Sequence, residues 1–291
     1  MRFICIICNY RKSEIISQKT RDSDSQVVKC NSCSHIQLYP LPLAKEDKSF
    51  YNQDLQSKDV FKRINILDLE KRSTVDTKRR VDFIRREFNN NESLLDVGSG
   101  YGFFIKAIGD AGFKTTGLEI SSARREISKS ITNIPLQSKA ITGPNKTKNQ
   151  YDIITLFHVL EHIKDPIKLC TDLKSYLQKG GTLIIEIPNT NHYLLNISKQ
   201  YKDFYWQRAH ISYFTPKTVL TVLEKAGYGK IKIKGVQRYT FINALRWVFL
   251  GRPQLKNPSY QTFTFGFMDN LYKKVLIERL LCDTLWIEVQ V

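Results

Sequence analysis

The sequence predicts an α/β fold, a mostly parallel sheet with helices on both faces, preceded by a small metal-binding ribbon. From residue 93 onward, short β-branched or apolar runs alternate with amphipathic helical stretches, which is typical of a parallel sheet with crossover helices. Near the start of the chain, two Cys-x-x-Cys pairs lie close together. The 291 residues are enough for one large domain and a small appendage.

The composition, with 42% hydrophobic and 25% charged residues, is that of a globular protein. No apolar run approaches the roughly 18 residues of a membrane span, and the first residues become polar too soon for a secretory signal. We therefore expect a cytoplasmic protein without a transmembrane segment. The net charge of +17 could attract nucleic acid, an acidic membrane surface or a phosphorylated substrate. Its densest cluster, residues 78–88, has the spacing of a solvated helix face, so nucleic acid is not the expected partner.

Four cysteines indicate a zinc site. Cys5 and Cys8 form one Cys-x-x-Cys pair, and Cys30 and Cys33 form a second after 21 intervening residues. This spacing is typical of a structural zinc ion held by four thiolates, whose binding free energy replaces the core that so short a segment lacks. Disulfides are the alternative, which the expected cytoplasmic location disfavours. We expect His35 to be a neighbour of this site and not a ligand.

The elements of the α/β region follow from apolar spacing. Six runs are expected to form strands: residues 93–97, 113–119, 151–157, 181–188, 230–236 and 283–290. Apolar residues recur at the helical period over about residues 57–90, 243–249 and 268–280, which predicts helices there. Another helix has clear ends, with Thr215 as its N-cap, Pro216 in its first turn and Gly227 after its last.

A glycine loop follows the first strand of this region. A dinucleotide fingerprint would place its third glycine at Phe103, whereas the glycines here are Gly98, Gly100 and Gly102. A phosphate loop would end in Gly-Lys-Ser/Thr, which is absent from this stretch. The pattern that remains is a turn whose backbone can approach a nucleoside, with Glu119 at the end of the next strand. That carboxylate can accept hydrogen bonds from both hydroxyls of a ribose.

Over about residues 75–235, the sequence resembles the S-adenosylmethionine-dependent methyltransferases of class I. The resemblance rests on "LLDVGSGYG", "GLEIS", "YDIITLFHVLEHIKDP" and "LQKGGTLIIEIPN". The chain is also similar to bacterial members that carry a ribbon with two Cys-x-x-Cys pairs and end in "AHISYFTPKTVLTVLEKAGY", many of which modify sugars or surface polysaccharides. Quinone-ring O-methyltransferases share the "EHIKDP" feature. The resemblance implies a seven-stranded, mostly parallel Rossmann-like sheet whose last strand is antiparallel.

The resemblance also implies the domains and the cofactor site. Residues 1–45 would form the zinc ribbon and residues 46–291 the methyltransferase domain, with 238–280 as an insertion over the site or the surface of a homodimer. The residues expected to bind S-adenosylmethionine are Asp96, Gly98, Ser99, Gly100, Gly102, Glu119, Ile120, Phe157 and His158.

Residues 158–162, "HVLEH", also match the His-x-x-Glu-His pattern of one metalloprotease group. We reject that interpretation because the stretch follows directly on a buried strand, and the resemblance explains it as the segment that leaves this strand beside the cofactor. Phe157 and His158 would then flank the methionine part of the cofactor. Phe157 could equally be a core residue.

Transfer of a methyl group to an alcohol or phenol requires a proton acceptor, a task that suits histidine. Four of the five histidines lie between residues 158 and 210, after strands whose carboxyl ends should meet at the site. His210 is the preferred catalytic base and His158 the second candidate, whereas a structural histidine bonded to backbone is the alternative. The Tyr- and Trp-rich residues 191–214 would line a sugar or aromatic pocket, or form a core layer.

The sequence thus predicts an enzyme that methylates oxygen on a small-molecule or carbohydrate acceptor, such as a surface glycan or nucleotide sugar. A quinone or phenol O-methyltransferase is the first alternative. An RNA-modifying or nucleic-acid-binding protein is the second, because of the basic charge. A non-catalytic protein that keeps the fold for assembly is the third, which the intact glycines and Glu119 argue against.

Overall fold

The computed structural model describes residues 2–42, 66–145, 150–252 and 266–291. Their contacts divide the chain into two compact units, each assembled from separate stretches of sequence. The first unit contains Met1–Pro42, Leu160–Cys170 and Ile185–Glu288. The second contains Leu43–Val159, Thr171–Ile184 and Val289–Val291.

The N-terminal ribbon is a small antiparallel sheet in the first unit. Its strands β1 (Ser13–Ser17), β2 (Gln26–Cys30) and β3 (Ile36–Tyr39) pair in chain order. A fourth strand, β8 (Ser212–Tyr213), comes from the second half of the chain and pairs with the free edge of β3. Beneath this sheet, Val27 and Leu38 pack against Trp206 and Tyr213. The ribbon therefore shares its core with residues 206–213.

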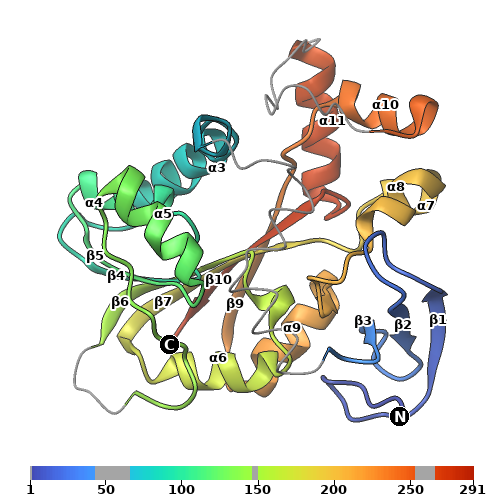
Figure 1. Ribbon diagram of the computed structural model, residues 1–291, viewed down its shortest axis with the longest axis horizontal. Helices are drawn as coiled ribbons and strands as arrows, with labels where there is room; N and C mark the ends of the chain where they lie inside the picture. The colour runs from blue at the N-terminus through green and yellow to red at the C-terminus, as the bar shows by residue number, and fades with distance from the viewer. Residues whose placement is uncertain (1, 43–65, 146–149, 253–265) are drawn as a thin grey trace. The chain divides into compact units, whose positions relative to one another are not determined.

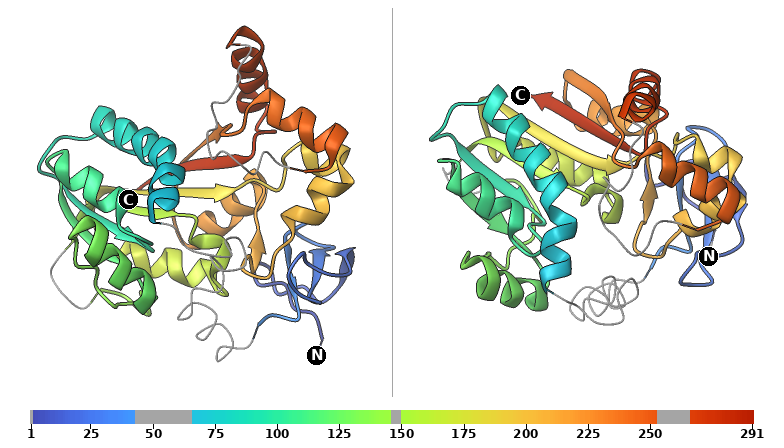
Figure 2. Two further views of the ribbon diagram at one scale, coloured as in Figure 1. Left: turned by 45° about the horizontal axis from the view of Figure 1, so that its top comes forward. Right: turned by 90° about the horizontal axis from the view of Figure 1, so that it is seen from above.

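The larger sheet has its strands in the order β5-β4-β6-β7-β10-β9 (Figure 1). β4 pairs in parallel with both β5 and β6, and the arrow of β10 runs opposite to that of β7 (Figure 2). Most residues of β4, β6 and β7 are buried, as expected for central strands covered on both faces. The strands are β4 (Ser93–Val97), β5 (Lys114–Leu118), β6 (Tyr151–Phe157), β7 (Leu177–Pro188), β9 (Lys230–Val236) and β10 (Thr284–Gln290).

Six strands form this sheet in the described residues, so the expected number of seven is wrong. The six runs predicted from apolar spacing are the six strands observed. At the outer edge of β5, where a seventh strand could pair, the described residues form one parallel bridge, between Leu118 and Gln137. The Gln137 backbone bonds Gly117 at 2.9 Å and Glu119 at 3.1 Å. Pro135, two residues before the bridge, has no N–H to donate, which hinders a longer strand.

Helices connect the strands, as the alternating pattern predicted. α9 begins after Thr215, whose hydroxyl accepts the Thr218 N–H while the Thr218 side chain bonds back to Thr215, and Gly227 follows the helix at φ +82°. The predicted helix of residues 57–90 is observed over Ile66–Glu87, and residues 57–65 lie outside the described part. The helices are α3 (Ile66–Glu87), α4 (Phe103–Asp110), α5 (Ser122–Thr132), α6 (Pro166–Lys174), α7 (Leu194–Ile197), α8 (Lys199–Tyr205), α9 (Pro216–Lys225), α10 (Phe241–Leu250) and α11 (Gly266–Glu278).

α10 and α11 form the helical part of residues 238–280, as the sequence predicted. Whether this segment covers the site or joins two copies of the chain stays a prediction. None of the helices in the described residues has the length and apolarity that crossing a bilayer requires.

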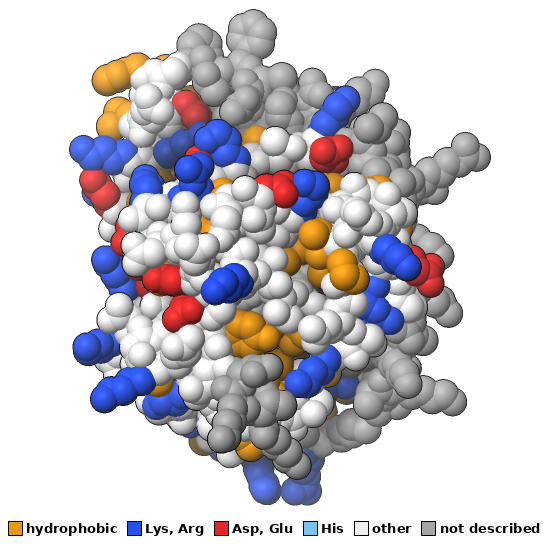
Figure 3. Space-filling view, turned by 90° about the vertical axis from the view of Figure 1, so that its left-hand side faces the viewer, with side chains coloured by type: hydrophobic (Ala, Val, Ile, Leu, Met, Phe, Trp, Pro, Cys, Tyr) orange, Lys and Arg blue, Asp and Glu red, His pale blue; other side chains and the backbone are white. Residues whose placement is uncertain are grey.

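The basic cluster on α3 is only partly a solvated face. Lys78 and Arg86 are exposed, but Arg79 and Arg80 are half-buried, and Arg79 pairs with Asp76 at 2.9 Å. On the face shown in Figure 3, Lys and Arg side chains lie among Asp and Glu side chains and do not gather into one patch. The charge is therefore dispersed on this face, which does not resemble the continuous basic stripe of a nucleic-acid groove.

Candidate functional site

The two Cys-x-x-Cys pairs form two turns with the same hydrogen-bond pattern. In the first, the Asn9 N–H donates to the Cys5 carbonyl at 2.9 Å, and in the second the Ser34 N–H donates to the Cys30 carbonyl at 3.0 Å. Asn9 and Ser34 have φ of 60° and 62°, so the chain reverses immediately after the second cysteine of each pair. Each turn therefore presents two thiols toward the other turn.

The four sulfurs fit a tetrahedral zinc ion. All four lie within 4.8 Å of one another, with Cys5 to Cys33 and Cys8 to Cys30 both at 3.5 Å. Zinc–sulfur bonds of about 2.3 Å in tetrahedral geometry place the sulfurs about 3.8 Å apart. Burial opposes ionisation of Cys8, but hydrogen bonds from the Tyr10 backbone and from neighbouring cysteines lower its pKa to about 7.

His35 is a neighbour of this site. It is fully buried, its ring lies 5.4 Å from that of Phe214, and it is absent from the donor group formed by the described cysteines. Burial lowers the pKa of His35 to about 3, so the imidazole is neutral. It contributes to packing beside the metal turns.

In the second unit, the glycine loop joins β4 to α4. A Cβ atom on Gly98 would come within 2.5 Å of Val159, so only glycine fits where these two segments approach. Gly100 differs, because a Cβ there would meet nothing within 4 Å. Its φ of +56° nevertheless favours glycine. The backbone at Gly100 thus borders open space, where a ligand could lie.

Glu119 lies directly after β5 and reaches this loop. One carboxylate oxygen accepts the Gly100 N–H at 2.9 Å, and the other accepts the Ser121 N–H at 2.8 Å. The side chain is buried, whereas the adjacent Ile120 is 52% exposed. A carboxylate has about four acceptor positions. Two of them are used by the backbone here, which leaves capacity for the hydroxyls of a ribose.

Asp96 and Ser99 stabilise the start of the loop. Both are buried, and the Ser99 hydroxyl donates to the Asp96 carbonyl at 3.0 Å. The Thr155 hydroxyl of β6 donates to the Asp96 carboxylate at 2.7 Å. Burial raises the pKa of Asp96, and the Thr155 bond opposes that rise. Asp96 therefore links β4 to β6 beneath the loop, and Gly102 ends the loop at φ +81°.

The end of β6 carries the other expected cofactor residues. Phe157 is buried, and its ring meets that of Phe104 edge-on at 4.9 Å. The Arg80 guanidinium lies 4.4 Å from the centre of the Phe157 ring. His158 has φ of 57°, a conformation that few residues other than glycine adopt and that is concentrated at functional sites.

The stretch "HVLEH" does not form a helix. After β6 it becomes a short 3₁₀ turn, Leu160–His162, whereas two histidines of a metalloprotease must share a helix face. His158 belongs to neither of the two groups of described side chains that could hold a metal ion. This geometry agrees with rejection of the protease interpretation.

The second group of described side chains that could hold a metal ion consists of Glu161, His162 and His210. All three belong to the first unit. Their donor atoms lie within 4.8 Å of one another, and Glu161 and His210 are buried. His162 Nδ1 lies 2.6 Å from the Ala209 carbonyl, and its ring meets that of His210 edge-on at 5.1 Å. The Gln207 amide nitrogen lies 2.7 Å from His210 Nε2 and 3.1 Å from Nδ1. This cluster can exchange a proton or hold a metal ion.

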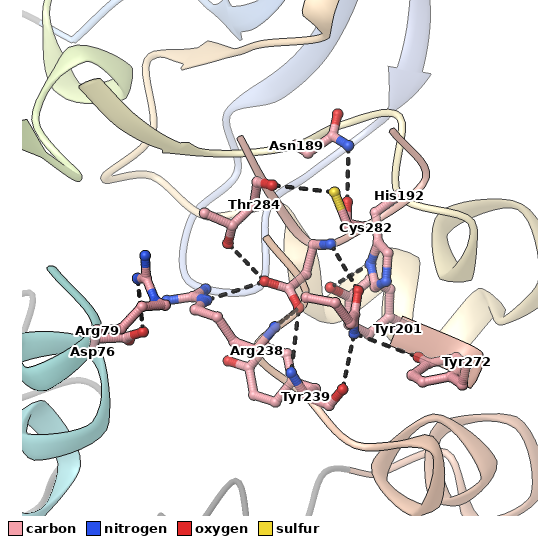
Figure 4. A network of polar contacts seen from close by, with 12 residues as sticks. Asp76, Arg79, Asn189, His192, Tyr201, Arg238, Tyr239, Tyr272, Cys282 and Thr284 are labelled. Carbon is pink, nitrogen blue, oxygen red and sulfur yellow. Dashed lines mark hydrogen bonds and ion pairs between the residues drawn. The ribbon is translucent and has the colours of Figure 1, made fainter. Parts of the chain in front are cut away.

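A further buried network lies near the carboxyl end of β7. His192 and Tyr201 point toward one another in Figure 4, with His192 Nδ1 3.0 Å from the tyrosine hydroxyl. Arg238 pairs with the buried Asp283 at 3.0 Å. The Asn189 side chain donates to the Cys282 carbonyl at 2.8 Å. These bonds fix the segment after β7 to the start of β10.

Most large aromatic side chains of residues 191–214 are core residues. Tyr201 packs with Trp247 of α10, and Trp206 and Tyr213 pack beneath the ribbon. The interpretation as a core layer is therefore the one that the packing favours. Sequence patterns also missed Arg80 and Gln207, because neither belongs to a motif and both act through contacts with distant residues.

Comparison with known proteins agrees with the geometry. The family model described as a methyltransferase domain matches residues 69–233, more than half of the chain. A ubiquinone biosynthesis O-methyltransferase of Coxiella burnetii is 24% identical over 181 residues, which cover 56% of this chain and 75% of that protein. One from Actinobacillus pleuropneumoniae is 29% identical over 122 residues, which cover 38% of this chain and 52% of the relative. This chain thus spans only about half the length of the latter.

Among solved structures, a SAM-dependent methyltransferase from Archaeoglobus fulgidus matches with a TM-score of 0.53 at 16% identity. The match covers 82% of this chain and 99% of that one. At this level of identity the two share a fold.

Proposed function

We propose that this chain, which belongs to the S-adenosylmethionine-dependent methyltransferases, transfers a methyl group from that cofactor to a hydroxyl oxygen of a small-molecule acceptor. The observation that carries the proposal is the pairing of Glu119 with the Gly100 backbone beside open space. This pairing supports the proposal because a carboxylate that could accept ribose hydroxyls lies next to backbone that a nucleoside could approach.

The residues at the loop fit the cofactor. Glu119 would accept hydrogen bonds from the ribose hydroxyls, and the exposed side chain of Ile120 would cover the base. Phe157 and His158, at the end of β6, would flank the methionine part. S-adenosylmethionine supplies a methyl group bound to a positively charged sulfur. Holding donor and acceptor in line can supply about 7–11 kcal/mol of the barrier reduction.

The acceptor hydroxyl must lose its proton as its oxygen bonds the methyl carbon. S-adenosylmethionine, when bound, would supply the methyl group and keep the electron pair of the broken carbon–sulfur bond on its sulfur, and His210, the proposed base, would accept the proton. A neutral imidazole is needed for this step. Glu161 and His162 lie close enough to stabilise the charge that His210 gains, because all three donor atoms lie within 4.8 Å of one another. His158 is the second candidate for this role.

Two classes of acceptor are proposed. The first is a carbohydrate, such as a surface glycan or nucleotide sugar, which the sequence resemblance implies and to which the net charge of +17 would attract a phosphorylated form. The second is a phenolic ring, because the named relatives are ubiquinone biosynthesis O-methyltransferases. Both acceptors present a hydroxyl to the same proton acceptor.

The test uses S-adenosylmethionine with a radiolabelled methyl group and separated fractions of a cell extract: carbohydrates and nucleotide sugars, quinone precursors, and RNA. We expect label in one of the first two fractions. We also expect His210→Ala to lower kcat by about 10²-fold or more, with the Kd for the cofactor within about twofold of the unmodified chain. Label confined to RNA would refute a small-molecule acceptor.

A second variant tests the cofactor site. Glu119→Gln removes the charge that accepts the ribose hydroxyls, and we expect the Kd for S-adenosylmethionine in calorimetry to rise about 10- to 100-fold. Glu126→Gln, on the exposed face of α5, is the control and should bind normally. Normal binding by Glu119→Gln would contradict the assignment.

A further inference from the structure

α10 is apolar on both of its sides. Of its ten residues, one is charged, Arg246. One side of the helix packs inward through Ala244 and Trp247. The opposite side is exposed and carries Leu245, Val248, Phe249 and Leu250. A helix that is apolar all round is normally buried, so the outer side of α10 has the composition of a surface that something covers.

α11 carries a second exposed apolar surface. Its inner side holds the buried Asp269 and Leu276 and the half-buried Tyr272. The exposed apolar residues recur every three or four positions and are Phe267, Met268, Leu271 and Val275. The two helices are joined, because the Asp269 carboxylate accepts the Phe241 N–H at 2.8 Å and the Phe241 ring lies 5.5 Å from that of Tyr272. We call the eight exposed apolar residues of this helix pair the α10–α11 face.

α8 adds to this face at the side of α10. The Phe204 ring of α8 packs against Trp247 at 5.1 Å and is itself partly exposed. The Ser198 hydroxyl, which caps α8, donates to the Trp247 carbonyl at 3.1 Å. Figure 1 shows α10 next to α8 and α11, and all of these helices belong to the first unit. The face is therefore built on a packed support.

The α10–α11 face is larger than the apolar patches of most monomers. Phe249 is 77% exposed and Phe267 is 82% exposed. These two side chains leave roughly 300 Å² in contact with water, and the eight together leave on the order of 900 Å². The largest apolar patch of a typical monomer is about 300–600 Å². Each partner in a stable protein complex buries about 800 Å², which this face can supply.

Charge distinguishes the partners that could cover the face. In α11, Lys273 and Lys274 are balanced by Asp269 and Glu278, and α10 adds Arg246, so the helix pair has a net charge of +1. The whole chain has +17, and two such chains repel one another. That repulsion is weak where the helix pair is nearly neutral. A helix that binds an anionic membrane is instead rich in Lys and Arg on its polar side.

We propose that two copies of this chain associate through the α10–α11 face and form a symmetric dimer. In such a dimer the same patch of both copies meets across a two-fold axis, so a face that is apolar and nearly neutral meets its own like. Phe249 and Phe267 are the main contacts, because aromatic side chains that become buried contribute most at interfaces. The dimer does not depend on which acceptor the chain methylates.

Sedimentation of the full chain between about 0.1 and 100 μM measures its association. We expect the mass of two chains at the upper end of this range. Phe249→Glu and Phe267→Glu together should raise the Kd of the dimer at least about 100-fold, because each places a charge against apolar side chains. Ile15→Glu is the matched control, since Ile15 is an exposed apolar residue of β1, and it should keep the original Kd.

Hydrogen exchange of the unmodified chain locates the contact without a substitution. Above the Kd, the amides of α10 and α11 should exchange more slowly than below it, whereas those of α9 should exchange equally at both concentrations. An increase from about 0.1 to 0.5 M salt should not weaken the dimer, because salt screens the repulsion between two positive chains.

The proposal is overturned if the chain remains monomeric up to about 100 μM. It is also wrong if Ile15→Glu weakens the dimer as much as the two phenylalanine substitutions do. A monomer that binds vesicles of anionic phospholipid, and loses that binding when Phe249 and Phe267 are replaced, would show that the face contacts a membrane and not a second copy.

Discussion

At the scale of single residues, His192 makes the pH dependence of stability predictable. It is 1% exposed and lies in the network of Figure 4 beside Tyr201. Burial lowers its pKa to about 4, an effect that the nearby Asp283 opposes and Arg238 supports. The imidazole therefore stays neutral in the folded chain at pH values where it would be charged when unfolded.

The free energy of unfolding should decrease as the pH falls below about 6.5. Between that pH and about 4 the unfolded chain binds the proton and the folded chain does not, so acid favours unfolding. The contribution of His192 amounts to about 2 kcal/mol at pH 5. Urea unfolding of the unmodified chain and of His192→Asn at pH 5 and pH 8 measures it.

His192→Asn keeps a polar atom toward Tyr201 but cannot be protonated, so the pH dependence should become weaker in this variant. Asn196→Ala, at a nearby exposed position, should keep the full dependence. Equal pH dependence in both variants would show that His192 is not the responsible group.

The candidate site could be predicted only where its residues are close in sequence or follow a strand. The glycine loop and Glu119 follow β4 and β5, so their meeting results from the parallel order of the strands. The strained backbone of His158 has no sequence signal, because a left-handed conformation there depends on packing. The bond between Arg21 and Gln207 has none either, since it joins positions that are 186 residues apart.

At the scale of elements, α9 provides a stability prediction. The hydroxyls of Thr215 and Thr218 bond reciprocally to each other's backbone N–H groups, which satisfies donors that the first turn leaves free. Thr215→Ala should lower the free energy of unfolding by about 1 kcal/mol. Thermal or urea unfolding measures the change.

Thr221→Ala is the control within the same helix, because its hydroxyl bonds only a carbonyl one turn earlier. We expect a change below about 0.5 kcal/mol there. If the two substitutions have equal effects, the cap does not stabilise α9 as inferred.

The shortest elements show what the spacing of apolar residues cannot predict. Long, regular strands and helices were predicted because their own side chains carry the period of the element. The bridge at Gln137 and the two-residue strand β8 are too short to carry any period. Both exist because a neighbouring edge offers backbone partners, which is information that a local pattern does not contain.

At the scale of the whole molecule, the metal site and the first unit should lose stability together. Cys30 is both a sulfur donor and the last residue of β2. We expect one zinc per chain by elemental analysis, and loss of that zinc together with a lower melting temperature in Cys30→Ser, because binding free energy of about 10 kcal/mol or more is removed.

Cys170→Ser serves as the control. Cys170 is buried on α6, its pKa is raised to about 12 by burial, and it is not one of the four sulfur donors. That variant should keep its zinc. A Cys30→Ser chain that still holds one zinc would mean that the metal binds elsewhere.

The fourth strand of the ribbon also affects the order in which the chain folds. β1, β2 and β3 are neighbours in sequence and can pair as soon as they leave the ribosome, but β8 is synthesised much later. Until then the outer edge of β3 offers unpaired backbone groups to other chains. Nascent chains should therefore be most prone to aggregation after the ribbon has formed and before residue 213 emerges, so slow translation across the middle of the gene would lower the yield of folded protein.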